Sequence, residues 1–212
     1  NFLNTSGAKI KWIGKRTVQI EGVKSLNSIK YSVMGDRIEA GTFCVAASLT
    51  AGNLLIKNFD SNLIQTELNL LRKIGSKIKS FDKKIYIRGP NKVKNINNIA
   101  TSEYPNFPTD LQAQFMVLLC KAQGRSTITE NIFENRFMHV AELRRLGARI
   151  IVKENKAIIE GNTEFLGAEL MSSDLRASVA LVLAAMVSRG RSVINRIYHL
   201  DRGYEKIENK LK

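Results

Sequence analysis

Three aspartates each stand at the start of a long apolar run, where a carboxylate can serve in two ways. They are Asp36, Asp110 and Asp174. A carboxylate at a helix start can accept hydrogen bonds from the first-turn N–H groups and so cap the helix. A carboxylate left free can instead act as a base in catalysis. The pattern favours capping for each aspartate taken singly. The sequence "FPT" before Asp110 can be read as a device that sets the angle at which the chain enters the helix, since a proline restricts its neighbour to extended conformations.

Arginines stand at related positions along the chain. Arg37 and Arg176 fall in the first turns of two of these helices, and Arg136 and Arg202 fall in loops that precede later helical segments. A planar guanidinium binds carboxylate or phosphate through two hydrogen bonds, and helix N-termini favour anions. If the helix starts meet at one end of the fold, the sequence predicts a site there for a small anionic molecule. The alternative is that the arginines are solvated or paired with carboxylates, as Asp201 could pair with Arg202.

An internal repeat positions these residues. Each unit opens with an apolar helix and continues with a short β-branched strand, an amphipathic helix, and two strands joined by a tight turn. The interval from Gly52 to Gly75 equals that from Gly124 to Gly147, and the following intervals, to Gly89 and Gly161, are equal as well. The period is about 70 residues, so each copy is a βαβαββ-like unit. The chain contains the end of one copy, two complete copies and a third that breaks off.

The apolar pattern of the two helices in each unit predicts the fold. The first helix, in residues 36–52, 110–124 and 174–190, is apolar nearly all round and ends in a glycine expected to terminate it, which predicts burial on every side. The second helix has an apolar stripe on one side, for example Leu68, Leu71 and Ile74. We therefore expect an inside-out α/β barrel, in which buried parallel helices are surrounded by sheets and amphipathic helices.

Composition limits the other classes of function. The net charge of +14 invites a nucleic-acid interpretation, but the lysines are scattered and no aromatic residues are interleaved with them. A basic surface also suits a small anionic substrate. The two cysteines, Cys44 and Cys120, lie in apolar helical patterns and predict buried thiols in a reducing compartment. Likewise, the two histidines, His139 and His199, read as packed side chains, and a zinc site is not expected. The longest apolar stretch, residues 177–187, is too short to cross a bilayer.

Four strings carry a resemblance to a known family: "FPTDLQAQF", "ENIFENRFMHVAELRRLGA", "SSDLRAS" and "IYHLDRGYEKIE". Together they resemble the second half of the UDP-N-acetylglucosamine enolpyruvyl transferases, which open peptidoglycan synthesis. The resemblance covers essentially the whole chain. It implies the enolpyruvyl transferase fold and a cytoplasmic enzyme with no cofactor, metal, nucleic-acid or membrane partner. The implied reaction transfers the enolpyruvyl group of phosphoenolpyruvate to the sugar 3-hydroxyl of UDP-N-acetylglucosamine and releases phosphate.

The resemblance also assigns roles to residues. Asp110 matches the aspartate that contacts the sugar hydroxyl and removes its proton, and Asp174 matches an aspartate beside the reacting carbons. Arg176 and Arg202 match arginines that hold the carboxylate and phosphate of phosphoenolpyruvate. Further matches are Ile132, whose main chain would contact the nucleotide-sugar, and Arg136, which would organise the site. Arg37 has only the repeat analogy behind it.

The chain departs from the family pattern because the first half is absent. The lysine–asparagine pair that grips phosphoenolpyruvate and the mobile loop with its proton-donating cysteine are missing, and so is the last strand of the third repeat. Residues 1–33 are expected to end one inside-out domain, and residues 34–212 to form the other. The chain would then need the N-terminal half of its polypeptide and would be inactive alone. The alternatives are a non-catalytic remnant that binds a nucleotide-sugar, an enolpyruvylshikimate-phosphate synthase-like enzyme, and a nucleic-acid binder.

Overall fold

The computed structural model describes residues 1–211, which form two compact units. The smaller unit is Asn1–Met34, and the larger begins at Gly35. The sequence predicted a boundary after residue 33, and Lys212, the last residue of the predicted second range, lies outside the described residues. The assignment of the first segment to the end of another domain stays a prediction.

The smaller unit is a short helix followed by a hairpin, α1 (Phe2–Thr5), β1 (Lys9–Trp12) and β2 (Val18–Glu21). The two strands pair antiparallel, with Trp12 opposite Val18. Large apolar side chains of this hairpin are exposed, including Trp12 at 73% and Ile20 at 70%. The unit therefore has almost no apolar core of its own, and its β-structure rests mainly on strand pairing.

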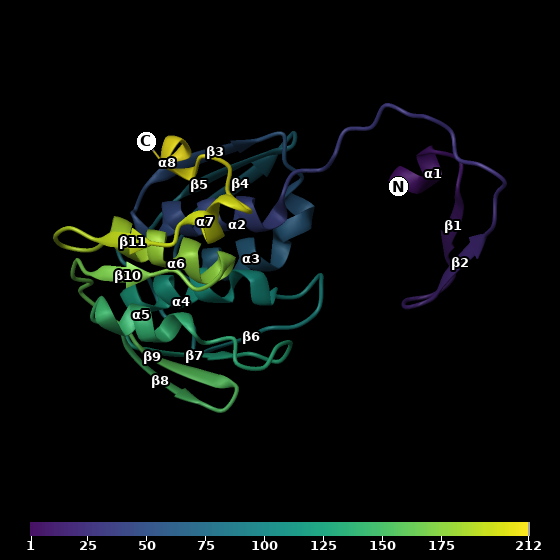
Figure 1. Cartoon of the computed structure of the whole chain (residues 1–212). Coiled ribbons are helices and arrows are strands. Elements are labelled where there is room, and N and C mark those ends of the chain that lie inside the picture. Colours follow the sequence, from purple (N-terminus) through teal and green to yellow (C-terminus); the bar gives the residue numbers. More distant parts are fainter. Residues whose placement is uncertain (212) are drawn as a thin grey trace. The chain divides into compact units, whose positions relative to one another are not determined.

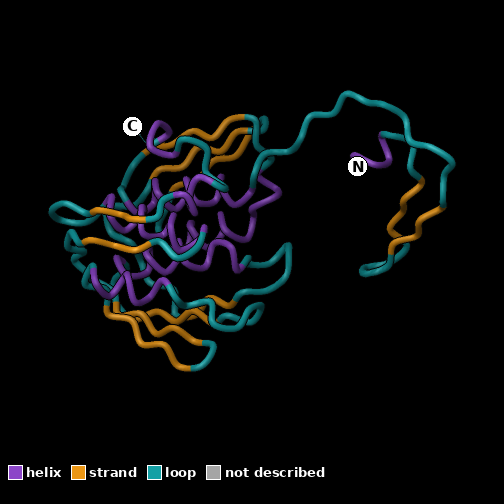
Figure 2. Tube along the Cα trace, in the orientation of Figure 1, coloured by secondary structure: helices purple, strands orange, loops and turns teal. Residues whose placement is uncertain are grey.

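Three helices form the buried layer of the larger unit, as the sequence predicted: α2 (Arg37–Leu49), α4 (Gln112–Lys121) and α6 (Leu175–Met186). Every residue of α4 before Lys121 is buried, α2 has only a few half-exposed residues, and α6 is mostly buried apart from some half-exposed residues and the exposed Met186 at its end. Figure 2 shows these helices in the middle of the unit, with strands on both outer sides. The helices α3 (Gln65–Lys73), α5 (His139–Arg145), α7 (Tyr198–Asp201) and α8 (Ile207–Lys210) and the 3-10 turns η1 (Ser61–Ile64) and η2 (Thr109–Leu111) complete the helical elements of the described residues.

The strands surround this helical layer as separate open sheets (Figure 1). One sheet has the order β3-β5-β4, another β6-β7-β9-β8, and a third pairs β10 with β11. The registers agree between units: Asn53 lies opposite Arg88 in the first, and the corresponding Arg125 lies opposite Glu160 in the second. The inside-out α/β arrangement is thus confirmed, although no sheet closes into a barrel within residues 1–211. The strands are β3 (Asn53–Lys57), β4 (Lys77–Phe81), β5 (Lys84–Arg88), β6 (Asn98–Ala100), β7 (Arg125–Thr129), β8 (Arg149–Lys153), β9 (Lys156–Glu160), β10 (Glu169–Met171) and β11 (Val193–Asn195).

The glycines that end the second helices adopt the expected left-handed conformation. Gly75 has φ of +110° and Gly147 has φ of +98°, and each directly follows the last turn of α3 or α5. This conformation suits glycine because it has no Cβ. The prediction that Gly52 terminates α2 in this way is wrong, since Ala51 takes the left-handed position with φ of +53°.

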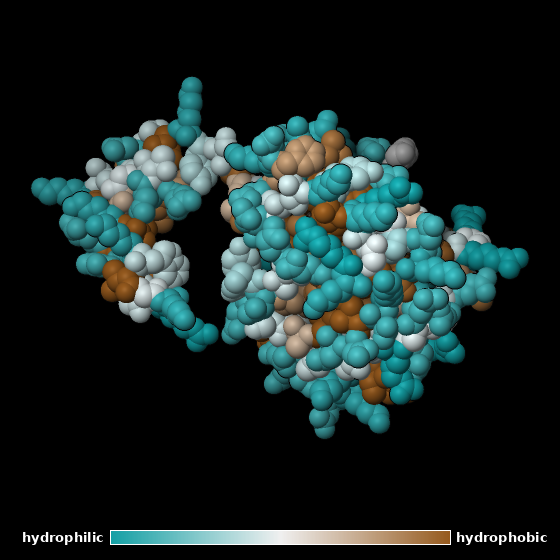
Figure 3. All heavy atoms as spheres, turned by 180° about the vertical axis from the view of Figure 1, so that it is seen from behind, coloured by the Kyte–Doolittle hydropathy of each residue, from teal (hydrophilic) through white to brown (hydrophobic). Residues whose placement is uncertain are grey.

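The surface of the larger unit is mostly polar, as Figure 3 shows from behind, with apolar side chains scattered among hydrophilic ones. Inside, the stripe of Leu68, Leu71 and Ile74 is fully buried, which confirms the amphipathic reading of α3. The thiols of Cys44 and Cys120 are buried too, and loss of hydration raises the pKa of each to about 12. Helices within residues 1–211 fall short of the length and apolar character needed to cross a membrane.

Candidate active site

The N-terminal ends of α4 and α6 border a cavity of about 420 Å³ in the larger unit. Because helix N-termini carry free N–H groups and a partial positive charge, this wall favours an anion. The start of α5 and the segment after α7 complete the lining. The lining residues are Thr109, Asp110, Gln112, Ala113, Arg136, Met138, His139, Asp174, Leu175, Arg176, Ala177 and Arg202.

Asp110 does not cap α4. It lies inside the 3-10 turn Thr109–Leu111, and α4 has no side-chain cap. Its Oδ1 accepts a hydrogen bond from Nε of Arg176 at 3.0 Å and one from Nη2 of Arg136 at 3.4 Å. The capping interpretation is therefore wrong for Asp110, because Leu111 occupies the N-cap position of α4 and Asp110 lies one residue before it, within the 3-10 turn. Its carboxylate faces the cavity between two guanidinium groups.

Asp174 and Asp36 do cap their helices, as the sequence pattern favoured. Oδ1 of Asp174 accepts from the backbone N–H groups of Arg176 and Ala177. Asp36 accepts in the same way from the first turn of α2. Of these two aspartates, only Asp174 lines the cavity. Its carboxylate therefore both caps α6 and faces the site.

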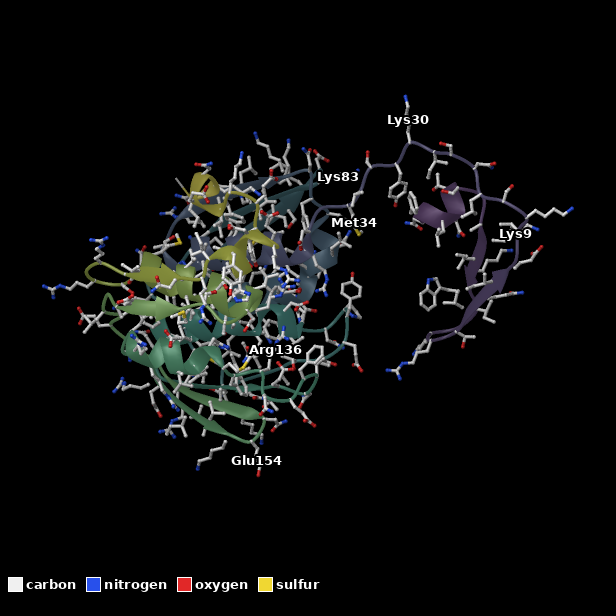
Figure 4. All side chains as sticks on the ribbon, viewed as in Figure 1. Lys9, Lys30, Met34, Lys83, Arg136 and Glu154 are labelled. Carbon is white, nitrogen blue, oxygen red and sulfur yellow. The ribbon has the colours of Figure 1, made fainter. Side chains whose placement is uncertain are left out.

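Three arginines converge on the cavity from separate parts of the chain. Arg176 lies in the first turn of α6, Arg136 in the segment between β7 and α5, and Arg202 at the end of α7. Figure 4 labels Arg136, which lies apart from Glu154 at the tip of the β8–β9 hairpin. The three guanidinium groups and the carboxylates of Asp110 and Asp174 give the lining a net charge of +1. Such a lining suits a multiply charged anion.

The segment that carries Arg202 is anchored by a buried tyrosine. The hydroxyl of Tyr204 lies 2.8 Å from that of Thr42 in α2, and Gln114 of α4 donates to the same threonine at 3.2 Å. Tyr204 is 1% exposed. This network fixes the chain beside Arg202 against both α2 and α4. The arginine itself stays exposed, with its charge available at the cavity.

Arg37 does not join the other arginines. Its Nη1 lies 3.8 Å from Oε1 of Glu67, and its guanidinium stacks over the ring of Tyr104. The repeat analogy for this residue is therefore wrong. The start of α2 lies outside the cavity, so only two of the three buried helices contribute their N-termini to it.

Ile132 also lies outside the cavity lining. Its backbone N–H donates to Oε1 of Glu130 at 2.9 Å, so contact with a nucleotide-sugar through its main chain stays a prediction. His139, which the sequence suggested was merely packed, does line the cavity while being 4% exposed. Its Nε2 has no hydrogen-bond partner in the described residues, and burial lowers the pKa of its imidazole to about 4.

Two residues, one in the cavity lining and one beside it, were not identified from the sequence. Thr109 and Glu130, which hydrogen bond to each other through Oγ1 and Oε2, were not singled out. The available signal was a carboxylate directly after the strand of the second unit. Residues 1–211 contain no group of three or more His, Cys, Asp or Glu side chains that could hold a metal ion.

Comparison with known proteins gives close matches over the whole chain. The profile of the EPSP synthase (3-phosphoshikimate 1-carboxyvinyltransferase) family matches residues 1–211. A UDP-N-acetylglucosamine 1-carboxyvinyltransferase from Pelagibacter ubique (strain HTCC1062) is 64% identical over 212 residues, which are 100% of this chain and 51% of that protein. One from Bartonella quintana (strain Toulouse) is 50% identical over 211 residues, covering 99% of this chain and 49% of that protein. The chain thus spans about half the length of the curated relatives it matches.

Solved structures agree with the fold. The enolpyruvyl transferase NikO from Streptomyces tendae has a TM-score of 0.87 and 26% identity, over 98% of this chain and 50% of its own. EPSP synthase from Acinetobacter baumannii has a TM-score of 0.75 at 19% identity, over 95% of this chain and 50% of its own. The second likeness concerns the fold alone.

Proposed function

This chain belongs to the EPSP synthase family, and from that membership we propose that the polypeptide carrying it is an enolpyruvyl transferase of peptidoglycan synthesis. The reaction would move the enolpyruvyl group of phosphoenolpyruvate to the 3-hydroxyl of UDP-N-acetylglucosamine and release phosphate. The choice of UDP-N-acetylglucosamine over 3-phosphoshikimate is supported by the 64% identity to the Pelagibacter relative, over 212 residues.

The observation that supports this chemistry is the carboxylate of Asp110, which caps no helix and lies between Arg136 and Arg176. A sugar hydroxyl is a weak nucleophile until its proton is removed, so a positioned base is needed. Asp110 is the group in this cavity whose oxygens are not committed to a helix start. We assign it the role of base.

The arginines would bind phosphoenolpyruvate. Arg176 lines the cavity from the first turn of α6 and Arg202 from the end of α7, and paired guanidinium groups suit the carboxylate and phosphate of this substrate. They would also neutralise charge as phosphate leaves. Asp174 would stand beside the reacting carbons, Arg136 would organise the site, and Ile132 would contact the nucleotide-sugar through its main chain.

The ion pair between Asp110 and Arg176 suggests an order of events. In the structure Nε of Arg176 lies 3.0 Å from Oδ1 of Asp110, so a guanidinium engages this oxygen before substrate binds. When an anionic substrate takes over the guanidinium, Oδ1 of Asp110 is released from the bond to Arg176 and can accept a hydrogen bond from the sugar hydroxyl. The base would thus become effective once phosphoenolpyruvate occupies the cavity.

The remaining features of the proposal concern the whole polypeptide. Because the chain spans about half of its relatives, the rest of the site, including the proton donor, would come from the other half of the polypeptide. Neither Cys44 nor Cys120 can replace that donor, since both thiols are buried within α2 and α4. The enzyme would act in the cytoplasm, and its product would feed cell-wall growth, cell shape and division.

The test is to complete the chain and measure transfer. The 212 residues are joined to the first half of the Pelagibacter relative, and phosphate release from phosphoenolpyruvate is followed with and without UDP-N-acetylglucosamine. Release that requires the nucleotide-sugar is expected, and the 212-residue chain by itself should release none. A completed protein that binds UDP-N-acetylglucosamine without turnover would instead support the non-catalytic alternative. Transfer to shikimate 3-phosphate in its place would support the EPSP synthase-like one.

A further inference from the structure

A buried carboxylate outside the cavity lining connects the segments that carry Asp110 and Arg136. Glu130 directly follows β7 and is 3% exposed. Its Oε1 accepts from the hydroxyl of Thr101 at 2.8 Å and from the backbone N–H groups of Ile132 at 2.9 Å and Phe133 at 3.2 Å. Its Oε2 accepts from the hydroxyl of Thr109 at 2.8 Å.

This number of donors is what a buried carboxylate requires. A charged group removed from water is costly unless hydrogen bonds replace its hydration, and bonds to an ionised acceptor are stronger than neutral ones. The cluster extends further, because Thr101 Oγ1 accepts from the N–H of Asn131 and the N–H of Glu130 donates to the carbonyl of Asn155. Glu130 is therefore held from its backbone and both carboxylate oxygens.

The two segments joined by Glu130 are the ones whose side chains meet at the site. Thr109 directly precedes Asp110 in the 3-10 turn. Ile132 and Phe133 open the loop that leads to Arg136. Across the cavity edge, Arg136 and Asp110 approach to 3.4 Å. The carboxylate of Glu130 thus holds both the loop that leads to Arg136 and the turn that contains Asp110.

Comparison between the repeat units argues that this arrangement is specific. The position of Glu130, counted from the glycine after the buried helix, holds Asn58 in the first unit and Arg196 in the third. Both of those residues have positive φ, 58° and 59°, whereas φ of Glu130 is not positive. Only the second unit, whose aspartate Asp110 does not cap its helix, has a carboxylate at this position. A requirement of the fold alone would apply to all three units.

We propose that Glu130 is a positioning residue for the transfer reaction, which locks the loop 131–136 to the turn Thr109–Leu111 so that Asp110 and Arg136 keep their relative placement. The inference rests on the proposed function for its catalytic consequence. The lock, meaning the hydrogen bonds by which Glu130 joins the loop 131–136 to the turn Thr109–Leu111, is a property of the 212-residue chain. These hydrogen bonds and their effect on catalysis can therefore be measured separately.

The lock is tested by amide hydrogen exchange of the 212-residue chain, with Glu130→Ala and Glu130→Gln. In Glu130→Ala the amides of Ile132 and Phe133 lose their acceptor and should exchange at least about tenfold faster, the factor expected for a lost hydrogen bond to a charged group. Glutamine can place its amide oxygen at the position of Oε1, so Glu130→Gln should retain most of the protection. Unchanged exchange of both amides in Glu130→Ala would overturn the proposal.

The catalytic consequence is tested in the completed enzyme. Misplacement of a catalytic group by about 1 Å can cost about 10²-fold, so Glu130→Ala should lower kcat by about that factor. KM for phosphoenolpyruvate should change little, because Arg176 and Arg202 are held elsewhere. Glu130→Gln should restore kcat to within about tenfold of the parent, since its amide oxygen keeps the three hydrogen bonds made to Oε1, without the charge, and its NH2 group can donate to Oγ1 of Thr109.

Glu160→Ala provides the matched control. Glu160 lies on the same pair of strands at the opposite end, where it pairs with Arg125 at 2.6 Å, and its loss should leave kcat unchanged. All assays are run well below the melting temperature of each variant, so that unfolding does not contribute. Equal kcat in parent and Glu130→Ala, or equal loss in the Ala and Gln variants, would refute the positioning role. Absence of transfer in the parent completed enzyme would refute the proposed function, and the exchange experiment would still decide on the lock.

Discussion

Replacement of Asp110 by asparagine separates the roles of this residue. The side chain keeps its shape but loses its charge. In the structure the carboxylate of Asp110 forms ion pairs with Arg176 at 3.0 Å and Arg136 at 3.4 Å. This carboxylate caps no helix. The change should therefore affect chemistry much more than folding.

The expected loss of stability follows from the exposure of the two ion pairs that Asp110 makes, and the expected loss of rate follows from the missing base. The three side chains are between 23% and 32% exposed, and ion pairs near the surface contribute only about 0.2–1 kcal/mol each. The free energy of unfolding should fall by less than about 2 kcal/mol. Loss of a general base costs about 10²–10⁴ in rate, which corresponds to about 3–5 kcal/mol of barrier. The catalytic loss should thus exceed the loss of stability.

The affinity for phosphoenolpyruvate, unlike the rate of transfer, should not fall in Asp110→Asn. Asp110→Asn raises the net charge of the cavity lining from +1 to +2 and frees Arg176 from its competing carboxylate. Since salt bridges to anions strengthen with uncompensated positive charge, phosphoenolpyruvate should bind as tightly as in the parent or up to about tenfold more tightly.

The assay uses the completed enzyme, with phosphate release for kcat and calorimetric titration for phosphoenolpyruvate. Asp36→Asn is the control, because Asp36 caps α2 away from the cavity and asparagine caps a helix about as well as aspartate. It should behave like the parent in every measurement. The reasoning fails if Asp110→Asn retains turnover within about tenfold of the parent, or if it loses affinity for phosphoenolpyruvate.

Three further predictions concern stability and the burial of the thiols. His139 has a folded pKa of about 4, below the unfolded value of about 6.5, so the unfolded state alone takes up a proton as pH falls through this window. Stability should drop by up to about 3 kcal/mol between pH 6.5 and 4, and thermal unfolding of His139→Gln should show a weaker pH dependence. Cys44 and Cys120 have pKa values raised to about 12, and a thiol reagent at pH 8 should label neither until denaturant is added; rapid labelling of the native chain would contradict their burial. Gly161→Ala would place a Cβ 1.9 Å from a backbone oxygen and should cost about 1–3 kcal/mol or more, whereas Gly22→Ala, with nothing within 4 Å, should leave the unfolding free energy nearly unchanged.

Much of the fold followed from local patterns. Helices that are apolar all round had to be buried, and the equal glycine intervals placed matching helices and hairpins in successive units. These features are readable because burial and turn geometry impose their residue preferences within a few positions along the chain. The exceptions were also local: Ala51 took the left-handed position expected of Gly52.

The site depended on details that the pattern does not contain. Asp36, Asp110 and Asp174 look alike in sequence, yet two cap their helices and one does not. The difference is a 3-10 turn, which places Leu111 at the N-cap position of α4 and Asp110 one residue before it. Likewise Arg37 and Arg176 both fall in the first turn of a buried helix, but Arg37 lies against Tyr104 and Glu67 instead of the cavity.

The sequence by itself determined the repeat, the buried helices and the supply of carboxylates and guanidinium groups at the helix starts. Only the tertiary structure decided which of them meet, because Asp110 and Arg176 are separated by 66 positions in the chain and touch only when α4 and α6 pack together. It also revealed Glu130, whose four donors come from three separate segments. Charge and hydrogen bonding act over a few ångströms in space, and the order of residues along a chain specifies those distances only after the helices have packed.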